Sequence, residues 1–336
     1  MKYRRLGKSA LEISVVGFGG WGIGGGALWD GHTDTPEAIR TIHAAFDRGI
    51  TLFDTAPAYA DGRSEELLGK ALADRRSDVI IADKISPPDV HSSRVRASVE
   101  ASLHRLRTDY IDLLQQHWPA EEDEENSRIV EEMLALKKEG KVREVGVSNF
   151  GRRELELAGH NDRILSDQLP YNMLFRAIEY HIVPALESRG MDIICYSPLL
   201  QGLLTGKFSG ADEVPVERAR TRHFSGERPQ ARHGEAGAEE LTFSTLADLR
   251  RLAEESGLEL KDLALGWLLR RDRVASILVG ARSPAQAEDN AKVSELELPD
   301  ELYHAASEKT EALKEAMGPN PDLWQHESRI SIESLG

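Results

Sequence analysis

The sequence predicts a (β/α)8 barrel, or TIM barrel, that is preceded by a β-hairpin and carries a long loop after the seventh strand. Two observations predict this fold. Short apolar runs alternate with amphipathic helical segments along most of the 336 residues, which is typical of parallel strands joined by crossover helices. The runs number about eight, which is the strand number of this barrel.

The candidate strands are short and rich in branched and aromatic side chains. Their length and composition favour strands over buried helices. We expect them at residues 15–18, 51–53, 79–82, 111–114, 145–147, 167–169, 193–196 and 277–279.

The segments between these runs have the ends and the periodicity of helices. Thr35 and Pro36 open one helix as N-cap and first helical residue, Gly49 closes it, and Ser64 begins another. Apolar residues at spacings of three and four predict helices that pack one face on the sheet. These stripes are Val95, Val99, Leu103 and Leu106, and then Ile129, Met133 and Leu136.

Three segments depart from the simple alternation. Residues 3–6 and 11–14, separated by a Gly-Lys-Ser turn, predict a hairpin before the barrel. Pro184 interrupts the helical pattern of residues 179–188, so we expect that helix to start late or to bend. Residues 208–240, rich in Gly, Arg, Pro and Glu, predict a long variable loop, of the kind that forms functional lids or is disordered.

The chain organisation predicts one domain. Length alone allows one large or two small domains, but α/β barrels often exceed the usual domain size. The sequence contains no linker and no repeat beyond the alternation itself. We therefore expect a single barrel domain over residues 1–336.

Composition narrows the class of protein. A net charge of −15 without a basic run argues against nucleic-acid binding, and an anionic cofactor would need a local basic pocket. The single cysteine, Cys195, cannot form an intrachain disulfide, and its apolar neighbours suggest a core position. The N-terminal segment lacks the apolar core of a signal peptide, and no run approaches a membrane span. We expect a cytoplasmic protein that acts on a small molecule, without an obligate protein partner.

Polar residues follow the candidate strands, where barrel active sites are built. Asp54 ends the second strand with Tyr59 five residues later, Lys84 ends the third, and His117 ends the fourth. Alone, each has an ordinary explanation: a turn or cap for Asp54, a surface charge for Lys84, a loop hydrogen bond for His117 and packing for Tyr59. Their convergence on one mouth favours a catalytic site.

These four residue types suit the polarisation of a carbonyl during hydride delivery. Tyrosine, with an ordinary pKa of about 10, keeps its proton at neutral pH but donates it slowly unless its phenolate is stabilised. We expect the Lys84 ammonium to provide that stabilisation and Asp54 to orient Lys84. His117 would hydrogen-bond the substrate oxygen where negative charge develops.

Seven motifs in order along the chain resemble the aldo-keto reductase superfamily. They are FDTAPAY, SEELLGKAL, IADK, YIDLLQQHWP, VGVSNF, YSPLLQGLLTGK and GARSPAQAEDN. The last motifs most resemble the branch that includes bacterial general-stress reductases and potassium-channel β subunits. Position 279 is Val where many relatives have Pro, and Asp83 precedes the lysine where Thr is common; neither difference removes a catalytic group.

The resemblance implies reversible hydride transfer between NADP(H) and an aldehyde or ketone. It makes Asp54, Tyr59, Lys84 and His117 the catalytic tetrad, with Tyr59 as general acid. Substrate would contact Trp21, Tyr59, His117 and Trp118, in a pocket to which Trp29 and the 208–240 loop also contribute. The cofactor residues that it implies are Gly20, Trp21, Asp54, Ser148, Asn149, Gln168, Tyr196, Ser197, Leu199, Gly202, Lys207, Gly280, Arg282, Gln286, Asp289 and Asn290.

Within that set, the resemblance implies more specific roles. Ser197, Leu199, Gly202 and Lys207 would line the pyrophosphate path, and Gly280, Arg282, Gln286, Asp289 and Asn290 would hold the adenosine end. Ser148, Asn149 and Gln168 would bind the nicotinamide carboxamide, and Tyr196 would stack on the nicotinamide ring. Arg282 favours NADP over NAD, because a guanidinium can donate two parallel hydrogen bonds to a 2′-phosphate. A solvated loop arginine is the alternative for Arg282.

Other folds and functions fit the sequence less well. Residues 17–22 satisfy G-x-G-x-x-G, but no helix opens directly after them, as a Rossmann site requires. A metal-dependent hydrolase would need several ligands, whereas His117 is the one histidine at a candidate strand end and Lys84 would repel a cation. A regulatory or redox-sensing subunit that binds NADP(H) with little turnover remains the alternative function.

Overall fold

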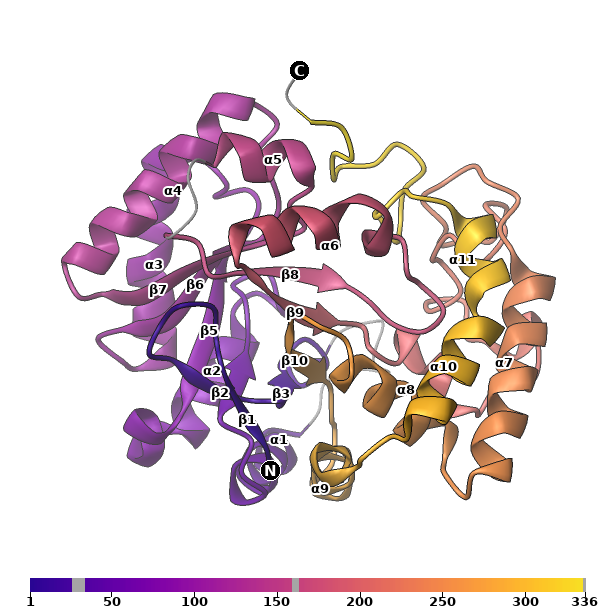
Figure 1. Cartoon of the computed structure of the whole chain (residues 1–336). Helices are drawn as coiled ribbons and strands as arrows, with labels where there is room; N and C mark the ends of the chain where they lie inside the picture. Colours follow the sequence, from indigo (N-terminus) through magenta and orange to yellow (C-terminus); the bar gives the residue numbers. More distant parts are fainter. Residues whose placement is uncertain (26–33, 159–162, 335–336) are drawn as a thin grey trace.

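The structure, a computed structural model, describes residues 1–25, 34–158 and 163–334. Its centre is a closed barrel of eight parallel strands in the order β10-β3-β4-β5-β6-β7-β8-β9 (Figure 1). The strands are β3 (Val16–Gly19), β4 (Leu52–Asp54), β5 (Ile80–Ile85), β6 (Ile111–Gln116), β7 (Val142–Ser148), β8 (Ser166–Pro170), β9 (Asp192–Tyr196) and β10 (Val274–Val279). The predicted (β/α)8 barrel is confirmed.

Several strand bounds differ from the prediction: β5 ends three residues later than expected, and both β10 and β7 begin three residues earlier. In β7 the sequence shows the reason. Arg143 is exposed and Glu144 half-buried, so these polar side chains hid the first half of the strand in the apolar pattern.

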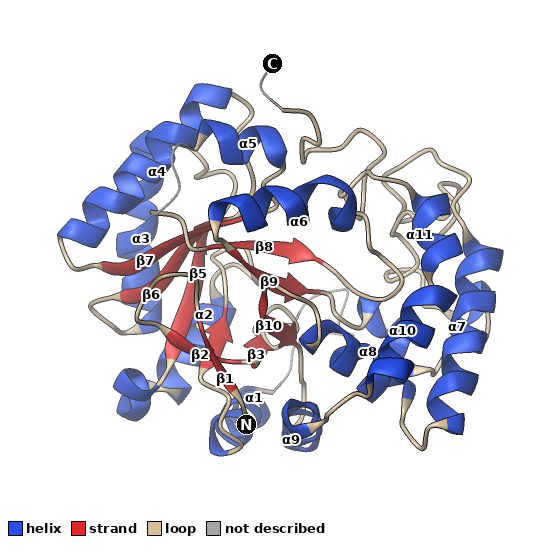
Figure 2. Cartoon of the chain, in the orientation of Figure 1, coloured by secondary structure: helices blue, strands red, loops and turns tan. Residues whose placement is uncertain are grey.

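Helices surround the barrel, and a second group lies at one side of it (Figure 2). The surrounding helices are α1 (Thr35–Asp47), α2 (Arg63–Ala71), α3 (Ser92–Leu106), α4 (Asp123–Lys138), α5 (Arg152–Leu157), α6 (Ile178–Arg189) and α9 (Pro284–Lys292). The side group consists of α7 (Glu239–Glu255), α10 (Asp300–Lys309) and α11 (Glu311–Met317), in which α7 packs against α10 and α11. The helix α8 (Leu260–Leu269) packs on barrel strand β10 and also contacts α7.

One predicted helix start needs correction, and for a second helix one of the two alternatives is excluded. Asp34 is the N-cap of α1 and Thr35 its first helical residue, one position from the prediction. The helix α6 begins at Ile178 and includes Pro184, so it does not start late.

The predicted hairpin is present and closes the amino-terminal end of the barrel. Strands β1 (Tyr3–Arg5) and β2 (Glu12–Ser14) pair in antiparallel fashion. Leu6, Leu11 and Ile13 beside them are buried in one cluster with residues of the barrel interior. Burial of these side chains stabilises the closed end.

The barrel interior changes from apolar to polar along each strand. Side chains two residues apart lie on the same face of a strand. The inward face of one strand can therefore contribute one side chain to an apolar layer and the next to a polar layer. The apolar layer includes Leu52, Ala82, Leu113 and Ile194, and the positions two residues later carry Asp54, Lys84, Gln115 and Tyr196. The polar layer therefore lies at the carboxyl ends of the strands.

The long loop after β9 is ordered around buried side chains. It follows a 3-10 helix, Leu200–Thr205, contains a shorter one, Ala211–Glu213, and ends where α7 begins at Glu239. Phe224 and His223 are buried within it. No helix in the described part of the chain is both long and apolar enough to cross a membrane.

Candidate active site

A buried ion pair lies at the carboxyl ends of β4 and β5. Lys84 Nζ donates to Asp54 Oδ1 over 2.6 Å and to the backbone oxygen of Thr55 over 2.9 Å. Asp54 and Lys84 are 2% and 1% exposed. Burial raises the pKa of the Asp54 carboxyl, a shift that the Lys84 ammonium and the Gln168 amide oppose. This pair fixes the position of the lysine in the mouth of the barrel.

Tyr59 and His117 meet beside this ion pair. Their ring centroids are 5.8 Å apart in an edge-on arrangement, and Lys84 Nζ lies 4.8 Å from the Tyr59 ring centroid. The structure therefore brings the four predicted catalytic residues together, from the ends of three neighbouring strands.

The net effect of the surroundings of Tyr59 is to oppose release of its proton. Burial, together with the carboxylates of Asp54 and Asp83, holds the pKa of Tyr59 well above its ordinary value, where Lys84 was expected to ease proton release. The reason is geometric: the ammonium bonds to Asp54 and faces the ring of Tyr59. Tyr59 is consequently protonated at neutral pH.

His117 is neutral at the same pH. Burial and the Lys84 ammonium hold the pKa of the imidazole well below its ordinary value. Its backbone N–H donates to the oxygen of Ile85 over 3.0 Å, its backbone oxygen accepts from Asn149 Nδ2 over 3.0 Å, and its Nδ1 lies 2.7 Å from Ser86 Oγ. A neutral imidazole in this place can donate one hydrogen bond and accept one.

A hydrogen-bonded chain of amide and hydroxyl groups connects the remaining residues of the polar layer. Gln168 Nε2 donates to Asp54 Oδ1 over 2.8 Å, and Ser148 Oγ donates to the Gln168 backbone oxygen over 2.9 Å. Asn149 Nδ2 donates to Ser148 Oγ over 3.0 Å, and Tyr196 Oη donates to Asn149 Oδ1 over 2.8 Å. The predicted nicotinamide residues are thus adjacent to the tetrad.

The predicted pyrophosphate residues follow β9, and two further predicted cofactor residues, Gly20 and Trp21, follow β3. Gly20 donates its N–H to the Asp54 oxygen over 2.8 Å, and the half-buried Trp21 comes next in the chain. Ser197 has a φ of +51° directly after β9, and Gly202 donates its N–H to the oxygen of Leu199 over 2.9 Å. Lys207 Nζ lies 4.9 Å from the Phe208 ring centroid.

The predicted adenosine residues form a second group around the start of α9. Asn290 Nδ2 donates to the Gly280 oxygen over 3.2 Å, and the Arg282 N–H donates to Gln286 Oε1 over 2.9 Å. Asp289 pairs with Lys261, which lowers the pKa of that carboxyl. This aspartate is therefore already engaged within the protein.

The predicted substrate residue Trp118 is covered by the C-terminal segment. The guanidinium carbon of Arg329 lies 3.8 Å from the Trp118 ring centroid, and Arg329 Nε bonds to Asp322 over 2.7 Å. Trp29 lies outside the described residues.

The sequence interpretation missed two polar residues of this region. Ser86 is 3% exposed beside His117, and Gln115 is fully buried with its Oε1 3.5 Å from Gln168 Nε2. Both could have been found from the strand period, because Ser86 lies two residues after Lys84 and Gln115 two residues before His117. Within the described ranges, no group of three His, Cys, Asp or Glu side chains could hold a metal ion.

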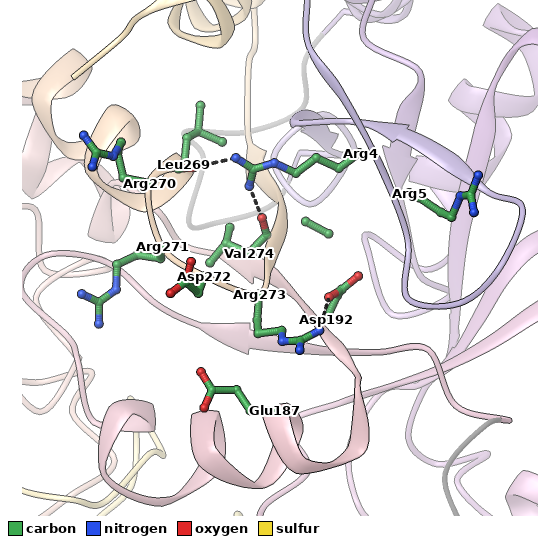
Figure 3. Close-up of a pocket in the computed structure, with 11 residues that line it drawn as sticks. Arg4, Arg5, Glu187, Asp192, Leu269, Arg270, Arg271, Asp272, Arg273 and Val274 are labelled. Carbon is green, nitrogen blue, oxygen red and sulfur yellow. Dashed lines mark hydrogen bonds and ion pairs between the residues drawn. The ribbon is translucent and has the colours of Figure 1, made fainter. Parts of the chain in front are cut away.

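A separate cavity of about 750 Å³ lies among β1, the end of α6 and the α8–β10 turn (Figure 3). Arginines dominate its lining, but most of them are engaged. Arg4 Nη2 donates to the Leu269 oxygen over 2.7 Å, Arg271 pairs with Glu179 over 2.6 Å, and Arg273 lies 3.8 Å from Asp192. These contacts tie the hairpin and α6 to the amino-terminal end of the barrel.

Comparison with known proteins identifies related chains along nearly the whole length. A profile described as the Aldo/keto reductase family matches residues 15–311. An aldo-keto reductase of Bacillus subtilis is 35% identical over 88% of this chain and 89% of its own. A protein of Escherichia coli named as an NADH-specific methylglyoxal reductase is 32% identical over 94% of this chain and 100% of its own.

A plant protein and a solved structure extend the comparison. A probable voltage-gated potassium channel subunit beta of Arabidopsis thaliana is 31% identical over 87% of this chain and 90% of its own. The structure of a glycerol dehydrogenase of Gluconobacter oxydans aligns with a TM-score of 0.76, at 31% identity, over 95% of this chain and 97% of that one.

Proposed function

The chain belongs to the aldo/keto reductase family, and from that premise we propose that it reduces an aldehyde or ketone reversibly to the alcohol, with NADP(H) as cofactor and Tyr59 as proton donor. The oxidoreductases among its relatives support redox activity. The observation that carries the proposal is the contact of Tyr59 with His117 and Lys84 above the Lys84–Asp54 ion pair.

The donor set of the mouth fits a nicotinamide cofactor. Gln168, Ser148 and Asn149 gather amide and hydroxyl groups that match the donors and acceptors of a carboxamide. The amide of Asn149 already makes three hydrogen bonds, so its Oδ1 would use its second lone pair. When bound, NADPH would supply the hydride.

The residues around the start of α9, which are predicted to bind the adenosine end of the cofactor, fit an anionic group. Arg282 stands before α9, whose first N–H groups and dipole favour a phosphate. Lys207, in the segment after β9, would add a positive charge between the nicotinamide and adenosine ends of the cofactor. These residues provide the local basic pocket that an anionic cofactor needs in a chain of net charge −15.

The chain's own residues then handle the proton. The carbonyl oxygen accepts hydrogen bonds from Tyr59 and His117, which orients the substrate and stabilises the charge that develops on oxygen. With a hydride supplied to the carbonyl carbon, Tyr59 would transfer its hydroxyl proton to that oxygen. The raised pKa of Tyr59 is compatible with this transfer, because an alkoxide is a stronger base than a phenolate. Solvent can restore the proton, since Tyr59 is only half-buried.

Two alternatives bear on the cofactor and on turnover. The Escherichia coli relative carries an NADH-specific name, so Arg282 is our basis for NADP(H) here. The channel-subunit name of the Arabidopsis relative motivates the regulatory alternative, in which the protein binds NADP(H) and turns over little.

Substitution of Tyr59 by Phe tests the proposed acid. We expect Tyr59→Phe to lower the rate of NADPH-dependent aldehyde reduction by about 10²- to 10⁴-fold, the usual contribution of a positioned general acid. NADPH affinity, measured by fluorescence titration, should be unchanged, because the hydroxyl donates a proton and does not hold the cofactor. Retention of the wild-type rate by Tyr59→Phe would remove Tyr59 from this role.

A further inference from the structure

Ser86 is a buried hydroxyl that the four-residue chemistry does not use. It directly follows β5, it is 3% exposed, and its Oγ lies 2.7 Å from His117 Nδ1. Its backbone oxygen accepts from the Asp89 N–H over 2.8 Å, which holds the turn that carries it. The hydroxyl therefore has a fixed place against one nitrogen of the imidazole.

The direction of this hydrogen bond follows from a count of donors and acceptors. A neutral imidazole carries its proton on one nitrogen and accepts at the other. In the described part of the chain, the Ser86 hydroxyl proton has no acceptor except His117 Nδ1. If Nδ1 carried the proton, the buried Ser86 O–H would remain unsatisfied, which is costly. Ser86 therefore donates, Nδ1 accepts, and the imidazole proton is on Nε2.

We propose that Ser86 is a positioning residue that fixes the Nε2–H tautomer of His117 and so makes it a hydrogen-bond donor to the carbonyl oxygen. Nε2 has no hydrogen-bond partner among residues 1–25, 34–158 and 163–334. The other contacts of His117 fix its backbone and one ring face, but Ser86 alone among them selects the tautomer. The assignment of the tautomer is independent of the proposed function. The effect of Ser86 on catalysis rests on that function.

The tautomer can be measured without substrate. Nitrogen NMR of protein labelled at histidine distinguishes a protonated from an unprotonated ring nitrogen, and loss of one signal in His117→Gln assigns the residue. We expect an unprotonated Nδ1 and a protonated Nε2 in the wild type at pH 7. In Ser86→Ala we expect a mixture of tautomers, and in Ser86→Thr, which retains the hydroxyl, the wild-type signals. A proton on Nδ1 in the wild type overturns the proposal.

Kinetics test the consequence. We expect Ser86→Ala to lower kcat roughly fivefold to tenfold, the effect of one net hydrogen bond, with NADPH affinity unchanged and with recovery in Ser86→Thr. The acid limb of the pH–rate profile should move to higher pH, because loss of the Ser86 donor makes Nδ1 easier to protonate. Ser294→Ala, which removes another buried serine hydroxyl that bonds to Ala291, is the matched control and should change none of these.

The outcomes separate this proposal from the proposed function. A wild-type protein with the expected tautomer and no turnover contradicts the function and leaves the tautomer assignment intact. If the wild type turns over and Ser86→Ala has the same His117 tautomer and the same rate, the role of Ser86 is contradicted and the proposed function is not.

Discussion

At the residue scale, the site consists of side chains that occupy each other's hydrogen-bonding groups. Lys84 is held by Asp54, Gln168 also bonds to Asp54, and Asn149 bonds to Tyr196. Such a preorganised arrangement would hold the proposed proton donor, Tyr59, and the proposed polarising imidazole, His117, in place without reorganisation during the proposed reaction. The residue types and their positions after the candidate strands were enough to predict that these side chains lie together at the mouth of the barrel.

What the sequence could not supply at this scale is the net effect of several charges on one group. The Lys84–Tyr59 proximity was predictable, but the rise in the Tyr59 pKa depends on burial and on the nearby carboxylates of Asp54 and Asp83. Both depend on the three-dimensional packing of three strand ends.

Substitution of Arg282 tests whether this residue makes the protein prefer NADPH to NADH. We expect Arg282→Ala to weaken NADPH binding by about 10- to 100-fold, because charged hydrogen bonds to phosphate contribute about 1.5–3 kcal/mol. NADH binding should change less than about threefold, since NADH lacks the 2′-phosphate. Isothermal titration of both cofactors measures this difference, and Arg251→Ala, at an exposed arginine of α7, is the control. Equal losses for the two cofactors would show that Arg282 does not read the phosphate.

At the element scale, the period of two along each strand explains how an apolar interior becomes a polar mouth. Positions 52 and 54, 82 and 84, and 113 and 115 differ only in their distance along the barrel axis. The same period identifies Ser86 and Gln115, whereas the bounds of β7 were harder to predict because outward polar residues interrupt its apolar run.

The ends of β3 and β4 approach each other closely at Gly20, so substitution of Gly20 tests how these strands are arranged. A Cβ at Gly20 would lie 2.4 Å from the backbone oxygen of Asp54 and 2.7 Å from Ser64 Oγ. Gly20→Ala must therefore displace the end of β4, and we expect a loss of about 1–3 kcal/mol in the free energy of unfolding together with lower turnover. Urea unfolding and single-turnover rates measure the two effects.

Gly210→Ala is the matched control for that experiment. Apart from its chain neighbours, no described residue has an atom within 4 Å of a Cβ at Gly210, and the Gly210 backbone is extended. If Gly20→Ala were as stable and active as Gly210→Ala, the strand ends would not constrain the site in the way described.

At the scale of the whole molecule, the loop after β9 and the C-terminal segment hold each other over the barrel. Arg222 pairs with Glu235 over 2.6 Å and donates to the Asn320 oxygen over 3.0 Å, and His326 lies 2.9 Å from Glu235. The sequence indicated a loop but not its contacts with the C-terminal segment, because these join residues 98 and 91 positions apart and have no local pattern.

Buried histidines make this assembly sensitive to acid. Burial lowers the pKa of His223 to about 4, and burial also lowers the pKa of His233. Because the unfolded chain binds a proton at the ordinary histidine pKa near 6.5, the stability that His223 contributes is complete above that pH and is lost as the pH falls toward 4. For His223 the loss between pH 7 and 5 amounts to about 2 kcal/mol.

The test compares wild type with His223→Gln, whose amide can still donate to the Leu174 oxygen that His223 Nε2 contacts over 3.0 Å. Urea unfolding at pH 7 and pH 5 should show a smaller pH-dependent loss in the variant, by about 2 kcal/mol. The same loss in both proteins would mean that His223 does not couple the loop to pH.

The central claim is that this mouth carries out carbonyl reduction with NADPH. The most direct measurement incubates the purified wild-type protein with NADPH and a panel of aldehydes and ketones, and follows cofactor absorbance together with alcohol formation. We predict that at least one carbonyl compound is converted to its alcohol with one NADPH oxidised per alcohol formed. Tight NADPH binding without oxidation across the panel would contradict the claim and favour the regulatory alternative.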